Sequence, residues 1–179
     1  MKPINAGIAA SVAGALLLLA ASPVANAGQD HAIRAFAAWE SQGQMTRTGP
    51  NQAMFTGMLS GEFYIDGDQG PMDAGEMTCP IAIYAKLDDN TQRAFGQCVL
   101  LDPKGNRLYI DVACAGTALV GCDGQSTVTG GTGELENATG GGKFVVRSSA
   151  HAFLLRADAA LNEAGRGIIY WPQLQFKTP

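Results

Sequence analysis

The sequence contains little histidine and carries no excess of positive charge. Only two of its 179 residues are His, and 12 Lys and Arg stand against 16 Asp and Glu. The net charge of −4 becomes −5 when Lys2 is left out with the N-terminal leader. Proteins that hold nucleic acid or an anionic membrane surface present a basic patch. We therefore expect no nucleic-acid partner.

Motifs for phosphate, zinc or a nucleophilic triad are also missing. The glycine-rich stretch 127–144 has no Lys-Ser or Lys-Thr at the spacing of a phosphate loop. The four Cys form no C-x-x-C unit, and their separations of 19, 16 and 8 match no common zinc finger. The two histidines are His31, in the N-terminal arm, and His151, so a two-histidine metal site would have to bring the arm onto the barrel. Ser148, His151 and Asp158 have triad residue types without a nucleophile elbow. The sequence predicts no metal, no cofactor and no catalytic residue.

Long helical periodicity is absent as well. Only residues 28–44 show it, where Ile33, Phe36 and Glu40 recur at helical spacing. This pattern predicts a short amphipathic helix or a loose arm. The composition, with 46% apolar and 16% charged residues, is that of a folded domain.

The chain begins with a leader. Residues 1–27 contain Lys2, an apolar run over 6–21 and the small residues Ala25-Asn26-Ala27, which is the order of a cleavable signal peptide. The apolar run is too short for a membrane span of about 20 residues. We expect a periplasmic or secreted protein without a membrane span in its mature form. An uncleaved N-terminal anchor is the alternative.

Short runs with partial alternation of apolar and polar residues fill most of the remaining sequence, separated by Gly, Asp, Asn and Pro. The candidate strands are 58–66, 81–87, 93–101, 107–114, 125–129, 143–149, 151–157 and 168–176. They predict an all-β fold, a closed eight-stranded antiparallel barrel, with a β-sandwich as the alternative. We divide the chain into a signal peptide at 1–27, an N-terminal arm at 28–50 and a single β-barrel domain at 51–179.

All four Cys lie beyond the leader, and an even number in an exported chain predicts two disulfides. A hairpin that turns over residues 88–91 brings Cys79 and Cys98 within one register step of each other, near bonding range. Cys114 and Cys122 then pair by elimination. Two other pairings remain as alternatives.

The segment 102–106, Asp-Pro-Lys-Gly-Asn, predicts a hairpin turn, because a proline sets φ near −65° and a glycine then supplies a positive φ. Leu101 and Arg107 should therefore face each other on neighbouring strands. In the second strand, the apolar residues at 108, 110 and 112 should share one buried face.

Two predicted strands carry polar residues on one face. Glu62 and Tyr64 share a face of one strand, and Tyr109 and Asp111 share a face of another. If these faces point inward, the four residues are candidates to bind and orient a small ligand. If they point outward, which is the favoured alternative, they belong to the barrel exterior. A shift of one residue in the strand register would move these side chains from one face of the sheet to the other.

The glycine-rich stretch also resembles a family signature. The segment 130–133, Gly-Gly-Thr-Gly, with Leu135, Ala138 and Gly140 after it, resembles a segment of the allene oxide cyclase and dirigent proteins and of small exported bacterial barrels. The resemblance covers residues 79–146. It implies an eight-stranded barrel with a central apolar cavity, often assembled as a trimer, that needs no cofactor. No catalytic residue carries over, because no motif matches the strands that hold the cavity residues of the plant proteins.

Together these observations predict an exported barrel that binds a small apolar or amphipathic molecule in its cavity. A cofactor-free cyclase or isomerase in the same cavity is the first alternative, and it requires an internal polar group with a displaced pKa. The second alternative is a protein-interaction module with a packed interior and an exposed apolar patch. A homo-oligomer is expected from the resemblance alone.

Overall fold

The computed structural model describes residues 28–149, 161–163 and 165–179. Within these residues the chain forms nine β-strands and one short 3₁₀ helix. The strands are β1 (Gln29–Gly49), β2 (Gln52–Gly67), β3 (Gly70–Lys86), β4 (Thr91–Leu101), β5 (Arg107–Thr117), β6 (Gly121–Gly131), β7 (Thr139–Ser148), β8 (Leu161–Glu163) and β9 (Arg166–Thr178). The helix, η1, spans Gly133–Leu135.

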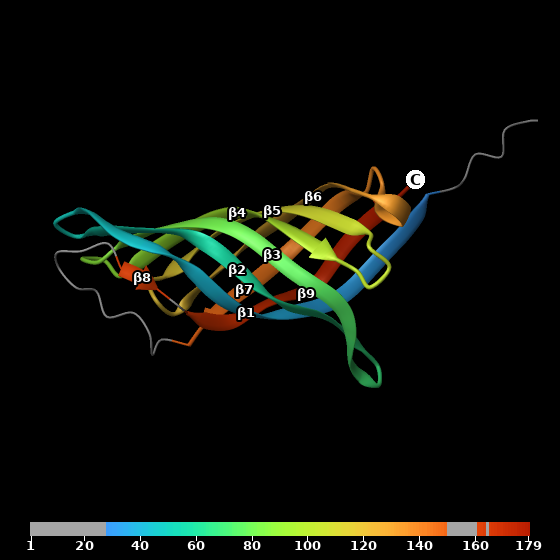
Figure 1. The fold of residues 1–179 in the computed structure, drawn as a ribbon, viewed down its shortest axis with the longest axis horizontal. Coiled ribbons are helices and arrows are strands. Elements are labelled where there is room, and N and C mark those ends of the chain that lie inside the picture. Colours follow the sequence, from blue (N-terminus) through green and yellow to red (C-terminus); the bar gives the residue numbers. More distant parts are fainter. Residues whose placement is uncertain (1–27, 150–160, 164) are drawn as a thin grey trace, which may run out of the picture.

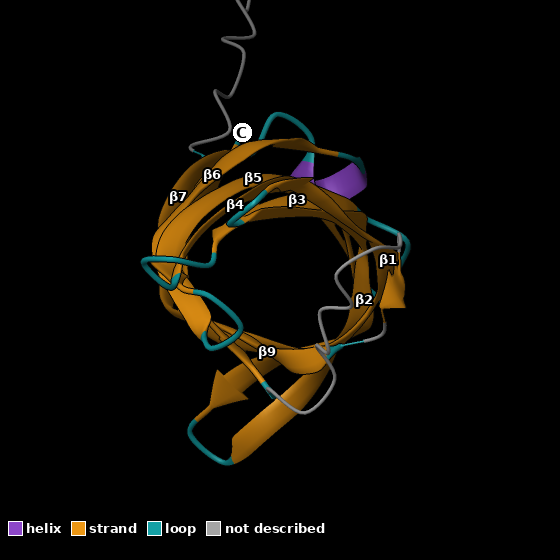
Figure 2. Cartoon of the chain, turned by 90° about the vertical axis from the view of Figure 1, so that its left-hand side faces the viewer, coloured by secondary structure: helices purple, strands orange, loops and turns teal. Residues whose placement is uncertain are grey.

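Eight of these strands form one closed antiparallel ring (Figures 1 and 2). Strands β1 to β7 pair in chain order as a meander, and β9 pairs with β7 on one side and β1 on the other. Ala37 shows the closure, because it faces Phe63 of β2 and Ile169 of β9. The short strand β8 pairs with β1 near Gln44, beyond the part of β1 that pairs with β9. The predicted eight-stranded antiparallel barrel is confirmed.

Seven of the eight predicted strands fall on strands of the ring, namely β2 to β7 and β9. The other, residues 151–157, lies outside the described residues. The strand that completes the ring is β1, which the sequence did not predict as a strand.

The prediction of a helix or loose arm over residues 28–44 is wrong, because these residues form most of β1. Ala37 and Trp39 face inward and are buried, as strand alternation requires. Phe36 lies on the other face, where its ring stacks on Tyr64 with 5.1 Å between centroids. Phe36, an apolar residue on the outer face of the strand, thus produced the spacing that suggested a helix. The residues assigned to an arm supply one wall of the barrel.

The predicted turn between β4 and β5 is confirmed, and Leu101 faces Arg107. The Asp102 carboxylate organises the turn by accepting hydrogen bonds from the backbone N–H groups of Lys104 and Asn106, each at 2.8 Å. It also accepts a bond of 2.8 Å from the Asn106 side-chain amide. This pattern stabilises a tight turn through contacts within the turn itself.

The glycine-rich segment has a structural role against this turn. Thr132 Oγ1 accepts a hydrogen bond of 3.0 Å from the Arg107 backbone N–H, and Asn106 Oδ1 accepts one of 3.1 Å from Glu134 N–H. Gly133 has φ of +61°, and a Cβ there would lie 2.0 Å from Asn106 Oδ1. The glycine is required by both its backbone conformation and the close approach. The segment that carries the family resemblance therefore anchors η1 at one end of the barrel.

Candidate functional site

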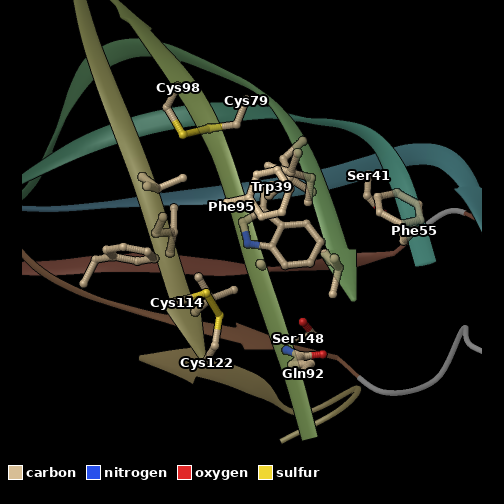
Figure 3. A pocket seen from close by; sticks show the side chains of 18 of the residues that line it. Trp39, Ser41, Phe55, Cys79, Gln92, Phe95, Cys98, Cys114, Cys122 and Ser148 are labelled. Carbon is tan, nitrogen blue, oxygen red and sulfur yellow. A yellow bond between two sulfur atoms is a disulfide. The ribbon is translucent and has the colours of Figure 1, made fainter. Parts of the chain in front are cut away.

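A partly enclosed cavity of about 80 Å³ lies inside the barrel, toward the end that carries the β3–β4 and β5–β6 turns (Figure 3). Every strand of the ring contributes to its wall. The apolar and disulfide-bonded residues that line it are Trp39, Met45, Phe55, Leu59, Cys79, Ile81, Ile83, Ala85, Ala94, Phe95, Cys98, Val112, Cys114, Leu119, Cys122, Phe144, Val146 and Ile169. Its polar residues are Ser41, Gln92 and Ser148.

Strand alternation delivers these side chains to the interior, except for Leu119 in the β5–β6 turn and Phe95, which lies on the outer face of β4 and is half exposed. On β4, Ala94 and Cys98 line the cavity, whereas Arg93 and Gln97 are exposed on the outer face. The same alternation on β5 buries the apolar residues at 108, 110 and 112, as predicted, and leaves Tyr109 exposed. The cavity is thus a gap in the packing of one continuous apolar lumen.

Both disulfides form part of the cavity wall. The β3–β4 register puts Cys79 opposite Cys98, with 4.1 Å between their Cα atoms. Cys114 and Cys122 lie diagonally across the β5–β6 pair, with 5.5 Å between Cα atoms. The predicted connectivity is confirmed. Each disulfide joins neighbouring strands at the lumen and supports the cavity from its wall.

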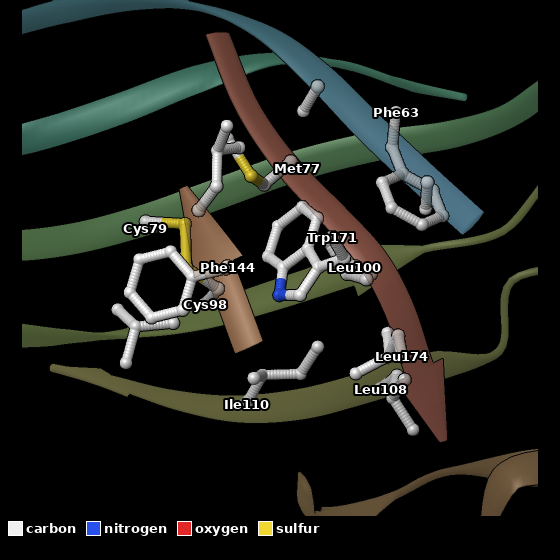
Figure 4. Close-up of a cluster of buried hydrophobic side chains, with 14 of the residues drawn as sticks. Phe63, Met77, Cys79, Cys98, Leu100, Leu108, Ile110, Phe144, Trp171 and Leu174 are labelled. Carbon is white, nitrogen blue, oxygen red and sulfur yellow. A yellow bond between two sulfur atoms is a disulfide. The ribbon is translucent and has the colours of Figure 1, made fainter. Parts of the chain in front are cut away.

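A packed aromatic and aliphatic layer forms the floor of the cavity (Figure 4). Phe144 belongs both to the cavity wall and to this layer, and its ring lies 6.3 Å from that of Trp171. Trp171 is fully buried and also meets Phe63 edge to face, at 6.1 Å. Met77 and Ile110 complete the packing around it. Among the described residues, the interior below the cavity is therefore packed.

Glycines make room for two aromatic side chains of the wall, Trp39 and Phe55. A Cβ at Gly43 or Gly57 would lie 2.5 or 2.6 Å from Cζ of Phe55. A Cβ at Gly167 would lie 2.4 Å from Cζ2 of Trp39. Because these glycines sit on β1, β2 and β9 beside the rings, they fix how deeply the rings pack against the sheet.

Two of the polar lining residues are anchored at the β5–β6 turn. Leu119, whose φ is +64°, donates its backbone N–H to Gln92 Oε1 at 3.3 Å. The next residue, Val120, accepts a hydrogen bond of 2.9 Å from Ser148 N–H through its carbonyl oxygen. The two interactions hold Gln92 and Ser148 at one side of the cavity. A non-glycine residue at positive φ is uncommon and recurs at binding sites.

The described charged groups lie outside the cavity. None of the described residues that line it is Asp, Glu, Lys, Arg or His. The groups with displaced pKa values lie elsewhere: a hydrogen bond from the Thr91 hydroxyl lowers the pKa of Asp89, and the hydrogen bond to Glu62 raises the pKa of Tyr64. The described wall therefore offers no side chain that could act as a general acid or base.

The four candidate residues from the sequence do not reach the cavity. Glu62, Tyr64, Tyr109 and Asp111 lie on the outer face, because their strand neighbours point into the lumen. Tyr64 donates a hydrogen bond to the Glu62 carboxylate. Asp111 accepts one of 3.1 Å from the Gln97 amide on β4. The placement is the exterior one that we favoured, and a ligand-binding role for these residues stays a prediction.

Sequence reasoning missed the residues that do line the cavity. The sequence did mark these residues as the apolar positions of alternating strands, as for Ala94 and Val112. That signal does not distinguish a packed core from a cavity wall. Trp39 was missed because its segment was taken for an arm.

Among the described residues, the remaining chemical candidates form no catalytic or metal site. His31 stacks on Phe176 at 4.7 Å and lies 3.4 Å from the Thr178 hydroxyl. His151 and Asp158 lie outside the described residues. The part of the chain that is described holds no group of three metal-ligating side chains and no helix that is long and apolar enough to cross a membrane.

Comparisons with known proteins leave the family as a resemblance. No family model matches the chain, and no curated protein matches it. Among solved structures that match is a pterocarpan synthase dirigent protein, with 10% identity and a TM-score of 0.37 over 97% of this chain and 99% of that one. A likeness of this size does not by itself identify a fold or an activity. The fold rests on the observed strand pairing.

Proposed function

We propose that this protein binds a small apolar or amphipathic molecule in the cavity of its barrel. The observation that carries the proposal is an apolar cavity, inside an otherwise packed barrel, with a few polar groups at one side. Concave sites of this kind are the usual place for small-molecule binding. Eight-stranded barrels have room for one small ligand at most.

A cofactor-free cyclase or isomerase is the weaker candidate. Such an enzyme needs a group that moves a proton or stabilises developing charge next to the substrate. The described lining residues supply hydroxyl, amide and indole groups but no titratable side chain. This composition favours binding over acid–base catalysis.

A protein-interaction role has one observation in its favour. Tyr84 and Phe95 stack on the outer face of β3 and β4 at 5.8 Å and are 47% and 51% exposed. Met58 on β2 is exposed as well. Exposed apolar side chains over neighbouring strands suit contact with another protein. Assembly into a homo-oligomer, which the family resemblance implies, belongs to the same candidate.

Export remains part of the proposal. The predicted signal peptide, residues 1–27, lies outside the described residues. Both pairs of Cys are disulfide-bonded, which is consistent with an oxidising compartment such as the periplasm or the extracellular space. A ligand would therefore be met outside the cytoplasm.

Tryptophan fluorescence tests the binding proposal. The chain has two Trp residues, of which Trp39 lines the cavity and Trp171 lies in the packed layer beneath it. In a Trp171→Phe background, titration with toluene should change the emission of Trp39 saturably. Amide chemical shifts of the wild-type protein provide the same readout if the variant does not fold.

Matched substitutions locate the binding. Ala94→Leu adds three carbons to the cavity wall and should abolish the saturable change. Ala113→Leu adds the same carbons on the outer face of β5 and should preserve it. If the folded, oxidised protein gives no saturable response to toluene or to longer apolar and amphipathic compounds, the binding proposal is wrong.

A further inference from the structure

The size of the cavity restricts its occupant. A volume of about 80 Å³ is about half of the ~150 Å³ of an engineered protein cavity that binds benzene. The enclosed part therefore accommodates a short chain or the inner edge of one ring. A bulky lipid does not fit, and any further part of the occupant must lie toward the open side.

The lining also restricts the charge of the occupant. The described wall contains no side chain of opposite charge for either an anion or a cation. Burying an ion without a partner costs far more than burying a neutral polar group. An ionised molecule would lose its hydration on entry and gain no ion pair with the described wall.

A pair of hydrogen-bonding groups lies beside the apolar wall at the β5–β6 turn, in addition to the buried indole N–H of Trp39, which has no partner among the described residues. The Leu119 N–H donates a hydrogen bond to Gln92 Oε1, and this bond fixes the orientation of the Gln92 side-chain amide. This leaves the Gln92 Nε2 donor without a hydrogen-bond partner among the described residues. The Ser148 side chain likewise has none there, although its backbone N–H is held by Val120. Both residues line the cavity and are fastened to the same turn.

We propose that the cavity selects an uncharged molecule with an apolar body of about one ring or a short chain and one oxygen acceptor, which receives hydrogen bonds from Gln92 and Ser148. The inference deepens the proposed function and rests on it. The apolar body packs against the disulfides and Phe144, while the hydroxyl or carbonyl oxygen of the ligand lies at the β5–β6 turn. Gln92 and Ser148 thereby determine specificity.

Three single-ring probes separate the contributions of shape, hydrogen bonding and charge. Toluene reports the apolar body alone, benzyl alcohol adds a hydroxyl group, and benzoate adds a negative charge. We expect benzyl alcohol to bind about fivefold more tightly than toluene, which corresponds to the net contribution of one hydrogen bond. Benzoate should bind at least about 100-fold more weakly than benzyl alcohol, because the described wall holds no cation to receive it.

Two variants test the assigned residues. Ser148→Ala should bring the affinity ratio of benzyl alcohol to toluene toward one, mainly by weakening the binding of benzyl alcohol. Gln92→Glu keeps an oxygen for the Leu119 N–H and removes the amide donor. Because a carboxylate can accept a hydrogen bond from an alcohol, this variant is measured with benzaldehyde, whose oxygen only accepts, and the affinity ratio of benzaldehyde to toluene should fall toward one. Ser60→Ala and Gln125→Glu, on outer faces of β2 and β6, are matched controls and should keep the wild-type ratio.

The outcomes separate this inference from the proposed function. If toluene and benzyl alcohol bind equally well to the wild type, or if benzoate binds best, the inference is overturned and the cavity remains a binding site. An unchanged ratio in both Ser148→Ala and Gln92→Glu also overturns it. If none of the probes binds and Ala94→Leu behaves as the wild type does, the proposed function fails and the inference fails with it.

Discussion

At the scale of single residues, close approaches between backbone and aromatic rings shape the cavity. Trp39 reaches its position because Gly167 on β9 has no side chain, and Phe55 lies over the paired Gly43 and Gly57. None of these glycines has a positive φ. Their role is therefore to provide space for the rings. A larger residue at these positions should lower stability through steric overlap.

Gly167→Ala should destabilise the oxidised protein by about 1–3 kcal/mol, the usual cost of overpacking. Its Cβ would lie 2.2 Å from the Arg147 carbonyl oxygen and 2.4 Å from Cζ2 of Trp39. Gly49→Ala is the control, because its Cβ would come no closer than 3.6 Å to any of its near neighbours. Urea unfolding measures both. Equal stability of the two variants would contradict the packing argument.

At the scale of elements, the β4–β5 turn carries its own stabilisation. Burial by itself raises the pKa of the Asp102 carboxyl. Hydrogen bonds from the Asn106 side chain and from the backbone of Asn106, Lys104 and Gly105 outweigh it, so the pKa lies below its ordinary value of 3.8. A carboxyl whose pKa is lower in the folded than in the unfolded state stabilises the fold above its unfolded pKa. This contribution is lost as the pH falls through the folded value.

The stability of the wild type should consequently decline between about pH 5 and pH 2, and part of the decline should come from Asp102. Asp102→Asn should lower stability at pH 7 and flatten the decline. Asp68→Asn, in the β2–β3 turn, is the control and should follow the wild-type pH profile. Urea unfolding at a series of pH values provides the measurement. A profile of Asp102→Asn as steep as that of the wild type would argue against the turn as a source of the pH dependence.

At the scale of the whole molecule, β1 closes the barrel by pairing with β2 and β9. Its removal would expose two strand edges and the apolar lumen. A chain that starts at residue 51 should therefore lose cooperative unfolding and aggregate, whereas a chain that starts at residue 28 should fold. Near-ultraviolet circular dichroism and size-exclusion chromatography distinguish the two results. A folded, monomeric chain from residue 51 would restore the interpretation of residues 28–50 as an arm.

Several features could be predicted from the sequence because their causes are local. The turn at Asp102 depends on side chains that bond to nearby backbone, and the alternation on β5 assigns Ile110 and Tyr109 to opposite faces. The Cys79–Cys98 pair follows from the register of a single hairpin. In each case the determining contacts are made by residues close in the chain or across one turn.

Other features were decided only by the tertiary structure, because they depend on contacts between distant residues. β1 becomes a barrel strand through its pairing with β9, for example Phe36 with Tyr170. Closure selects which face of every strand points inward, and so places Glu62 and Tyr64 outside. The position of the cavity depends on how side chains from eight strands fill one lumen. Phe144 and Trp171 pack solidly at one level, and above them the smaller Ala94 and Ala85 leave a gap.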